Sequence, residues 1–155
     1  MLPLTGGRTP TLVAGAEFVE GDGRLSPNGR WLAYTSNESG SWDVYVQAFP
    51  SLDRKWRISP DGGSRPTWRR DGKELFYIGP DQKLMTAPVT GDSQFVAGTP
   101  TPLFQVRMIP FPPTQSRQQY AVTAHGDRFL VNTVVEPAAP SPITVVLNWT
   151  AGLKK

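Results

Sequence analysis

Cysteine is absent from the 155 residues of this sequence, and there is a single histidine, His125. No disulfide and no thiolate site can form without cysteine. Zinc in proteins is held mainly by cysteine and histidine, so one histidine leaves too few typical ligands for a zinc site. A Ser-His-Asp triad would have to use His125, which lies in a context typical of a turn between strands. We therefore expect no metal site and no catalytic triad.

The sequence also lacks long stretches free of proline and glycine, and it lacks long apolar runs. The chain has 16 prolines and 15 glycines, so residues that interrupt helices come too often for long helices. The longest apolar run, Ile143 to Leu147 with one threonine, is too short to span a bilayer. Residues 1–10 have no apolar core of signal-peptide length. As written, the chain is predicted to be soluble, with no membrane insertion by this segment.

Signatures of nucleotide binding and catalysis are missing as well. The sequence has no G-x-G-x-x-G or G-x-x-x-x-G-K-[ST] loop, no kinase-type H-R-D or D-F-G, and no G-x-S-x-G elbow. Asp61, Asp71, Asp81 and Asp92 are spaced by roughly ten residues, unlike the D-x-[DN]-x-[DN]-G calcium loop. We predict no enzyme activity, no catalytic residue and no cofactor.

No block of one charge is present. The net charge is +3, but acidic residues lie beside the arginines instead of leaving a continuous basic stretch. Proteins that bind nucleic acid usually gather their lysines and arginines on one face. Nucleic-acid binding is therefore not expected.

What the sequence does contain is a repeat. The stretch "RLSPNGRWLAYTS" (24–36) resembles "TWRRDGKELFYIG" (67–79) when Gly29 is aligned with Gly72. A fainter third copy, "YAVTAHGDRFLVN" (120–132), has Gly126 in the same place. Each glycine lies between two short apolar runs, and the glycines are separated by 43 and 54 residues. Asn28, Asp71 and Asp127 flank the glycines, and we assign them structural roles in tight turns, where glycine adopts positive φ.

A repeat of this length made of short strands indicates the blades of a β-propeller. We predict an all-β fold with four-stranded antiparallel blades, three in this chain, forming half of a six-bladed ring. Residues 1–155 would be one propeller segment, with blade 1 at about 20–60, blade 2 at about 61–107 and blade 3 at about 115–155, completed by a strand at 9–16. The expected strands are Gly23–Ser26, Trp31–Ser36, Asp43–Phe49, Lys55–Ser59, Pro66–Arg69, Glu74–Ile78, Leu84–Val89, Pro102–Val106, Gln119–Thr123, Arg128–Val134 and Ile143–Trp149.

The stretch "LSPNGRWLAYTSNESGSWDVYVQAFP" resembles the TolB-type (WD-repeat-like) β-propeller repeat, with Asn28 in place of the aspartate of its Ser-Pro-Asp-Gly signature. The end, "SPITVVLNWTAGLKK", is similar to the end of bacterial serine/threonine kinases that carry such a propeller. The resemblance implies a non-catalytic module for protein or ligand interaction or sensing, from the periplasmic or extracytoplasmic part of a longer protein. The alternative that it leaves open is the substrate-filtering propeller of a prolyl-oligopeptidase-like serine peptidase.

Aromatic and cationic residues are the remaining candidates for binding, because tryptophan and arginine dominate binding hot spots. The predicted binding residues are Trp68, Arg69, Arg70, Arg24 and Arg65. The partner would be an unknown protein or small ligand.

Self-association is also expected, because three blades cannot close a ring. Two copies would close one through the apolar faces of the terminal blades. The side chains expected to be exposed on those faces are Leu32, Tyr34, Phe129 and Val131.

Overall fold

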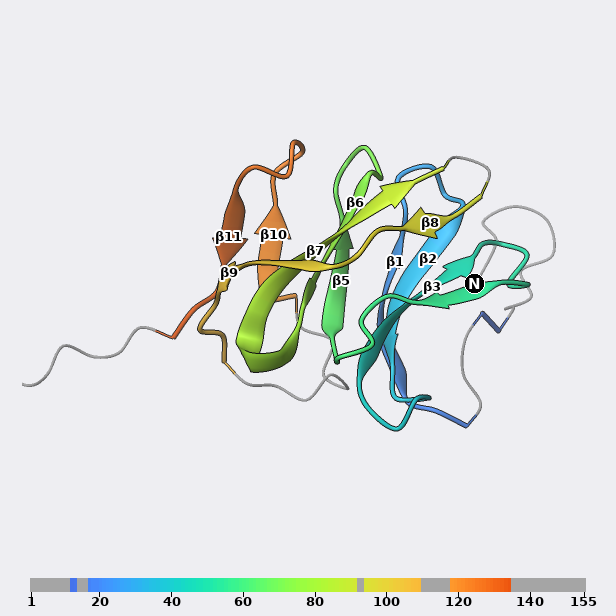
Figure 1. Ribbon diagram of the computed structural model, residues 1–155, viewed down its shortest axis with the longest axis horizontal. Helices are drawn as coiled ribbons and strands as arrows, with labels where there is room; N and C mark the ends of the chain where they lie inside the picture. The colour runs from blue at the N-terminus through green and yellow to red at the C-terminus, as the bar shows by residue number, and fades with distance from the viewer. Residues whose placement is uncertain (1–11, 14–16, 92–93, 110–117, 135–155) are drawn as a thin grey trace, which may run out of the picture.

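The structure is a computed structural model that describes residues 12–13, 17–91, 94–109 and 118–134, and this part of the chain is all β (Figure 1). It contains three antiparallel sheets and, within the described residues, no α-helix. The first sheet has four strands in chain order: β1 (Glu20–Leu25), β2 (Trp31–Ser36), β3 (Asp43–Ala48) and β4 (Lys55–Arg57).

The second sheet is centred on a long strand with a divided outer neighbour. Its first three strands are β5 (Ser64–Trp68), β6 (Glu74–Ile78) and β7 (Lys83–Thr90), and a single 3-10 turn, η1 (Pro80–Gln82), precedes β7. Two short strands, β8 (Val96–Ala97) and β9 (Thr101–Gln105), both pair with β7, β8 near its end and β9 along its first half. Together they form one interrupted outer strand.

The third sheet is a hairpin of β10 (Tyr120–Val122) and β11 (Phe129–Val131). The all-β expectation is therefore confirmed, and each predicted strand within the described residues has a counterpart. The short strand β8 was not predicted. The strands expected at 143–149 and, apart from residues 12 and 13, at 9–16 lie outside the described residues.

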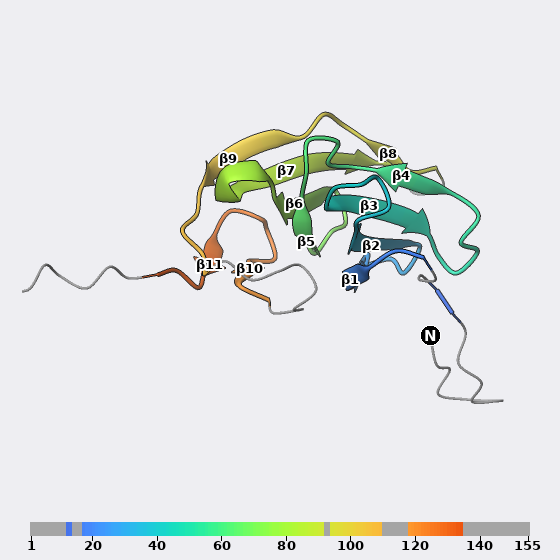
Figure 2. The ribbon, with the colours of Figure 1, turned by 90° about the horizontal axis from the view of Figure 1, so that it is seen from below.

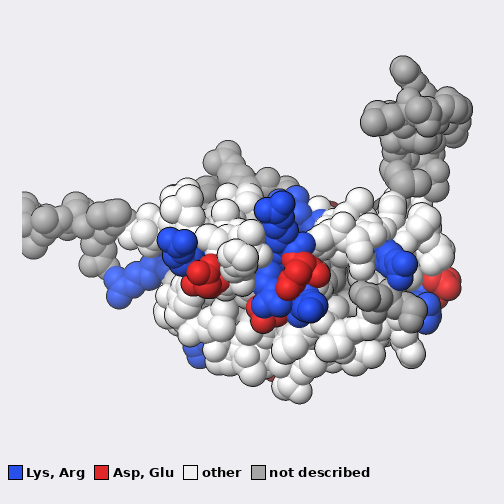
Figure 3. Space-filling view, turned by 90° about the horizontal axis from the view of Figure 1, so that it is seen from above, with Lys and Arg blue, Asp and Glu red and all other residues white. Residues whose placement is uncertain are grey.

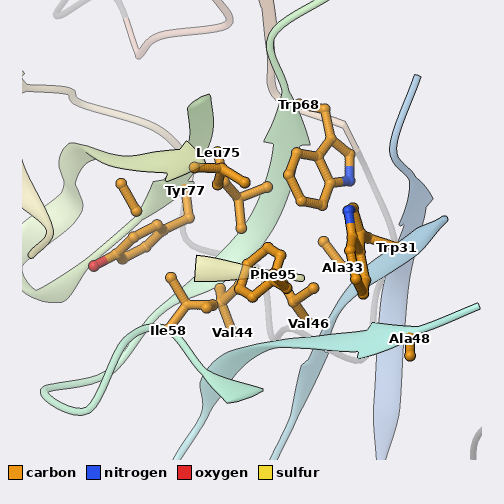
Figure 4. Close-up of a cluster of buried hydrophobic side chains, with 12 residues drawn as sticks. Trp31, Ala33, Val44, Val46, Ala48, Ile58, Trp68, Leu75, Tyr77 and Phe95 are labelled. Carbon is orange, nitrogen blue, oxygen red and sulfur yellow. The ribbon is translucent and has the colours of Figure 1, made fainter. Parts of the chain in front are cut away.

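The three sheets stand one behind another (Figures 1 and 2). Figure 2 shows the first strands β1, β5 and β10 on one side of this row and the outer strands β4, β8 and β9 on the other. Two apolar clusters fill the spaces between the sheets. Figure 4 shows the cluster between the first and second sheets, which includes Trp31, Val46 and Trp68.

Strand β6 explains how one sheet can serve both clusters. Successive side chains of a strand point to opposite faces. Leu75 and Tyr77 accordingly belong to the cluster shared with the first sheet, whereas Phe76 and Ile78 belong to the cluster shared with the third sheet. The continuous apolar run of β6 is therefore that of a strand buried on both faces.

The three repeat glycines lie in equivalent turns. Gly29, Gly72 and Gly126 have φ values of 70°, 74° and 76°, and each donates its backbone N–H to the carbonyl three residues earlier, at 2.8, 2.9 and 3.0 Å. Positive φ is costly for a residue with a Cβ, so the sequence interpretation of these glycines is confirmed.

The polar side chains beside these glycines close the turns, as expected. Asn28 Oδ1 accepts from Ser26 Oγ at 2.7 Å, and Asp71 Oδ1 accepts from the backbone N–H of Lys73 at 3.0 Å. In the third turn the acceptor is Asp127, which receives the hydroxyl of Thr123 at 2.6 Å.

The expectation of exposed terminal faces is wrong for three of its four residues. Tyr34 is buried, because its ring stacks on that of Tyr45 in the neighbouring strand, with centroids 6.0 Å apart. Phe129 and Val131 are half-buried and pack against the cluster between the second and third sheets, so they face inward. Leu32 is half-buried. The described residues include no helix of the length and apolarity that a bilayer crossing requires.

Candidate functional site

Trp68, the aromatic residue predicted to bind a ligand, is buried within the protein. Its side chain lies in the apolar cluster between the first two sheets (Figure 4) and is only 8% exposed. Its indole Nε1 donates to the carbonyl of Arg24 at 3.0 Å. The tryptophan therefore joins β5 to β1 and does not present its ring to a ligand.

Arg69 is occupied by acidic neighbours. Its guanidinium makes two hydrogen bonds to Asp71, at 2.7 and 2.8 Å, and an ion pair with Glu74 at 3.0 Å. The hydrogen bonds from Arg69 lower the pKa of Asp71 to about 2. Figure 3 shows basic and acidic side chains mixed on one face of the molecule. Arg70 is exposed beside this group, so the pair Arg69 and Arg70 does not form a uniformly basic surface.

Arg24 and Arg65, by contrast, lie on β1 and β5, the first strands of neighbouring sheets. Arg65 is seven residues before Gly72, and the residues seven places before Gly29 and Gly126 are Asp22 and Gln119. All three side chains are polar and buried, with 6, 6 and 3% exposure for Asp22, Arg65 and Gln119. Buried polar residues are uncommon, so three at one repeat position mark a shared site.

The backbone is strained at two of these positions. Asp22 and Arg65 have φ values of 55° and 56°, in the left-handed region that residues with a Cβ rarely adopt. Both lie where strand pairing is irregular, between Gly21 and Arg24 in β1 and between Ser64 and Thr67 in β5. Such bulges redirect side chains, and each strained residue costs on the order of 1–3 kcal/mol. The same distortion is thus maintained in both strands.

A hydrogen-bond network links the first strands of all three sheets. Tyr120 donates its hydroxyl to the carbonyl of Arg65 at 2.7 Å. Gln118, just before β10, donates to Thr67 Oγ1 at 3.1 Å and accepts from the Arg24 guanidinium at 2.7 Å. We call this set the first-strand cluster: Asp22, Arg24, Arg65, Thr67, Gln118, Gln119 and Tyr120.

The cluster offers hydrogen-bonding groups in a partly dehydrated setting. Burial raises the pKa of Tyr120, and the charge of Asp22 adds to this while those of Arg24 and Arg65 oppose it, so the hydroxyl remains a neutral donor. Gln119 donates its amide to the carbonyl of Ile109 at 2.9 Å, whereas its buried Oε1 has no hydrogen-bond partner among the described residues. The arrangement suits recognition of a polar or charged group.

No group of three His, Cys, Asp or Glu side chains within the described residues is placed to hold a metal ion. His125 lies exposed in the turn of the third sheet. Two members of the first-strand cluster, Arg24 and Arg65, were predicted from the sequence to bind a ligand. The other members were not predicted, although the seventh position before each repeat glycine also holds Asp22 and Gln119.

No protein-family model matches this chain, and neither a curated protein nor a solved structure shows significant similarity to it.

Proposed function

We propose that the chain is part of a β-propeller and acts as a non-catalytic binding module, with the first-strand cluster as its site. Three antiparallel sheets that follow one another in the chain, with equivalent glycine turns, support this architecture. The first strand of a propeller blade lies next to the central channel, where ligands often bind. The observation that carries the proposal is the buried polar residue at one repeat position in all three sheets.

The ligand that fits this cluster carries an anionic group, on a partner protein or a small molecule. Arg24 is half-exposed, and its guanidinium donates to Gln118 Oε1 and to the carbonyl of Gly23. A guanidinium has five N–H donors, so it can still receive a carboxylate or phosphate. The net charge of +3 also favours an anionic ligand.

The TolB-type resemblance supports a location for this module outside the cytoplasm. In bacterial proteins of that kind, such a propeller belongs to the periplasmic or extracytoplasmic part of a longer chain. We propose the same placement here, with the partner or ligand met outside the cytoplasm.

The test is an NMR titration of the full ¹⁵N-labelled chain with a hexaglutamate peptide. We expect saturable amide shifts at Arg24, Thr67 and Gln118, and their loss in Arg24→Gln. Arg54→Gln is the matched control, because Arg54 is an exposed arginine outside the cluster. Shifts spread evenly over exposed cations, or equal loss in both variants, would contradict the proposal.

A further inference from the structure

A separate cavity of about 320 Å³ lies beside the second sheet, and none of its lining residues belongs to the first-strand cluster. Apolar groups form much of its wall. They come from the loop before β5, from η1, from β7, from the break between β8 and β9 and from β9 itself: Pro60, Pro80, Met85, Pro100 and Pro102. Pockets that bind small ligands combine such a wall with a few polar groups.

Tyr77 contributes one of these polar groups. Its side chain is 2% exposed, and its ring belongs to the apolar cluster between the first and second sheets. Figure 4 shows the phenol oxygen pointing away from that cluster, and Tyr77 lines the cavity. This hydroxyl has no hydrogen-bond partner among the described residues. The side chain is otherwise enclosed, so its hydroxyl is available to hydrogen-bond a ligand that enters the cavity.

Two carboxylates flank the cavity. Asp61 and Asp81 both line it and are exposed, and the described part of the chain supplies neither with an ion pair. Burial raises the pKa of Tyr77 to about 12, and the negative charges of Asp61 and Asp43 add to the effect. Lys83 is the one cation on the wall formed by described residues. The cavity therefore presents an uncharged phenol and an excess of negative charge.

Asp81 is held in place by a strained turn. Asp81 and Gln82 both have φ of 56°, a conformation that hairpin turns usually assign to Asn-Gly or Asp-Gly. The turn is fixed to the chain beyond β9, since Gln82 accepts the backbone N–H groups of Val106 at 2.9 Å and Met108 at 2.8 Å. Asp81 is thus a fixed part of the rim.

We propose that this cavity binds a primary ammonium group at the end of an alkyl chain, as in a lysine side chain or a free alkyl diamine. The carboxylates and the phenol oxygen would accept the three ammonium hydrogens, because charge-assisted hydrogen bonds are the strongest that such groups make. The prolines and Met85 would cover the methylene groups. A quaternary ammonium fits less well, since it is usually held by a cage of several aromatic rings, and Tyr77 is the one aromatic residue among the described lining.

Calorimetric titration of the full chain with 1,5-diaminopentane and with the peptide acetyl-Gly-Lys-Gly-amide tests this proposal and distinguishes the two sources of the amine. We expect saturable binding of at least one amine and none of 1-pentanol, which lacks the charge. Asp61→Asn should weaken binding about tenfold. Tyr77→Phe, which keeps the buried ring, should also weaken it. Lys83→Gln should tighten binding, because it removes a like charge.

Asp53→Asn is the matched control. Asp53 is an exposed carboxylate in the β3–β4 loop, and its loss should leave binding unchanged. The proposal is overturned if neither amine binds saturably, if 1-pentanol binds equally well, or if Asp53→Asn weakens binding as much as Asp61→Asn. Since Arg24 is not part of the cavity, Arg24→Gln should also bind the amine normally.

Discussion

The three turn glycines share a backbone conformation but differ in their surroundings. A Cβ added to Gly29 would have no neighbour within 4 Å, whereas at Gly126 it would lie 2.8 Å from Arg69 Cδ and 3.2 Å from Phe76 Cζ. Arg69 cannot move aside freely, because its guanidinium is bound to Asp71 and Glu74. The third turn is therefore packed against the second sheet, and its glycine has a steric role as well as a conformational one.

Because of this difference, we expect substitutions of the two glycines to lower the stability of the fold by different amounts. Gly29→Ala should lower the free energy of unfolding by about 1 kcal/mol through positive φ alone, and Gly126→Ala should lower it by clearly more. Urea denaturation measures both. His125→Asn is the control and should be close to neutral, since His125 is exposed and its counterpart in the first turn is Asn28. A Gly29→Ala variant less stable than Gly126→Ala would refute the packing of the third turn.

Asp71 predicts a dependence of stability on pH. Its folded pKa, about 2, lies below the ordinary value of about 3.9. A carboxyl with a lowered folded pKa stabilises the fold above its unfolded pKa, and the contribution is lost as pH falls through the folded pKa. Asp71→Asn keeps an acceptor for the N–H of Lys73, as Asn28 does for Arg30. Above about pH 4 the variant should be less stable by less than about 1 kcal/mol, because the ion pair is exposed.

Urea melts of both proteins from pH 7 to pH 2 provide the measurement. The difference in stability should shrink as the pH approaches 2, and added salt should reduce it at pH 7. A difference that persists unchanged at pH 2 would show that the charge of Asp71 is not its cause.

At the level of the element, the local sequence predicted where the strands lie better than it predicted which sheets pack against them. Trp31–Ser36 and Glu74–Ile78 were predicted with the observed bounds, because runs of β-branched and aromatic residues between turns favour strands. Burial depends on which sheet lies opposite, and local pattern does not contain that information. Trp68 was therefore predicted to bind a ligand although it packs between sheets.

The first-strand cluster was only partly predictable for a related reason. Its repeat position holds an acid, a cation and an amide in Asp22, Arg65 and Gln119, so no residue type recurs there. The bulge that turns two of these side chains inward is a property of strand pairing. The bulge therefore cannot be inferred from the sequence of one strand alone.

Strand β8 is held to the protein by the residue just before it. Phe95 is 3% exposed, with its ring centroid 5.3 Å from Trp31 and 4.9 Å from Trp56 of the first sheet. Phe95→Ala should lower the free energy of unfolding by about 3 kcal/mol, since it leaves a cavity between aromatic rings. It should also make the segment after β7 more sensitive to limited proteolysis.

Val96→Ala provides the comparison, because Val96 is 51% exposed and its truncation should cost less than about 0.5 kcal/mol. Chemical denaturation measures both variants. Equal stability of Phe95→Ala and Val96→Ala would show that the aromatic contacts do not hold this segment.

At the scale of the whole molecule, the third sheet stands at one end of the row of sheets, and its strand β11 lies beside β9 (Figure 1). Leu103 and Phe104 of β9 are 43 and 44% exposed, and Leu130 of β11 is 78% exposed. Exposed apolar side chains at such an end are suited to contact with another protein. We propose that this end packs against the first sheet of a second copy, so that two copies related by a two-fold axis close a ring through two equivalent seams.

Light scattering at micromolar concentration tests the proposed association. The chain should behave as a dimer, and Leu130→Arg should shift it to a monomer without loss of folding. Val96→Arg, which places the same charge on another exposed apolar position, should remain dimeric. A stable, well-folded monomer of the unmodified chain would rule the association out.

The division of the outer strand into β8 and β9 has a consequence for solubility at high concentration. A continuous edge strand offers a row of free N–H and C=O groups to which strands of other molecules can add, the first step towards amyloid-like aggregation. Here the hydrogen bonding to β7 stops between Gly98 and Thr101, and Pro100 and Pro102 have no N–H to donate. The edge of the largest sheet is thus a poor template for fibril growth.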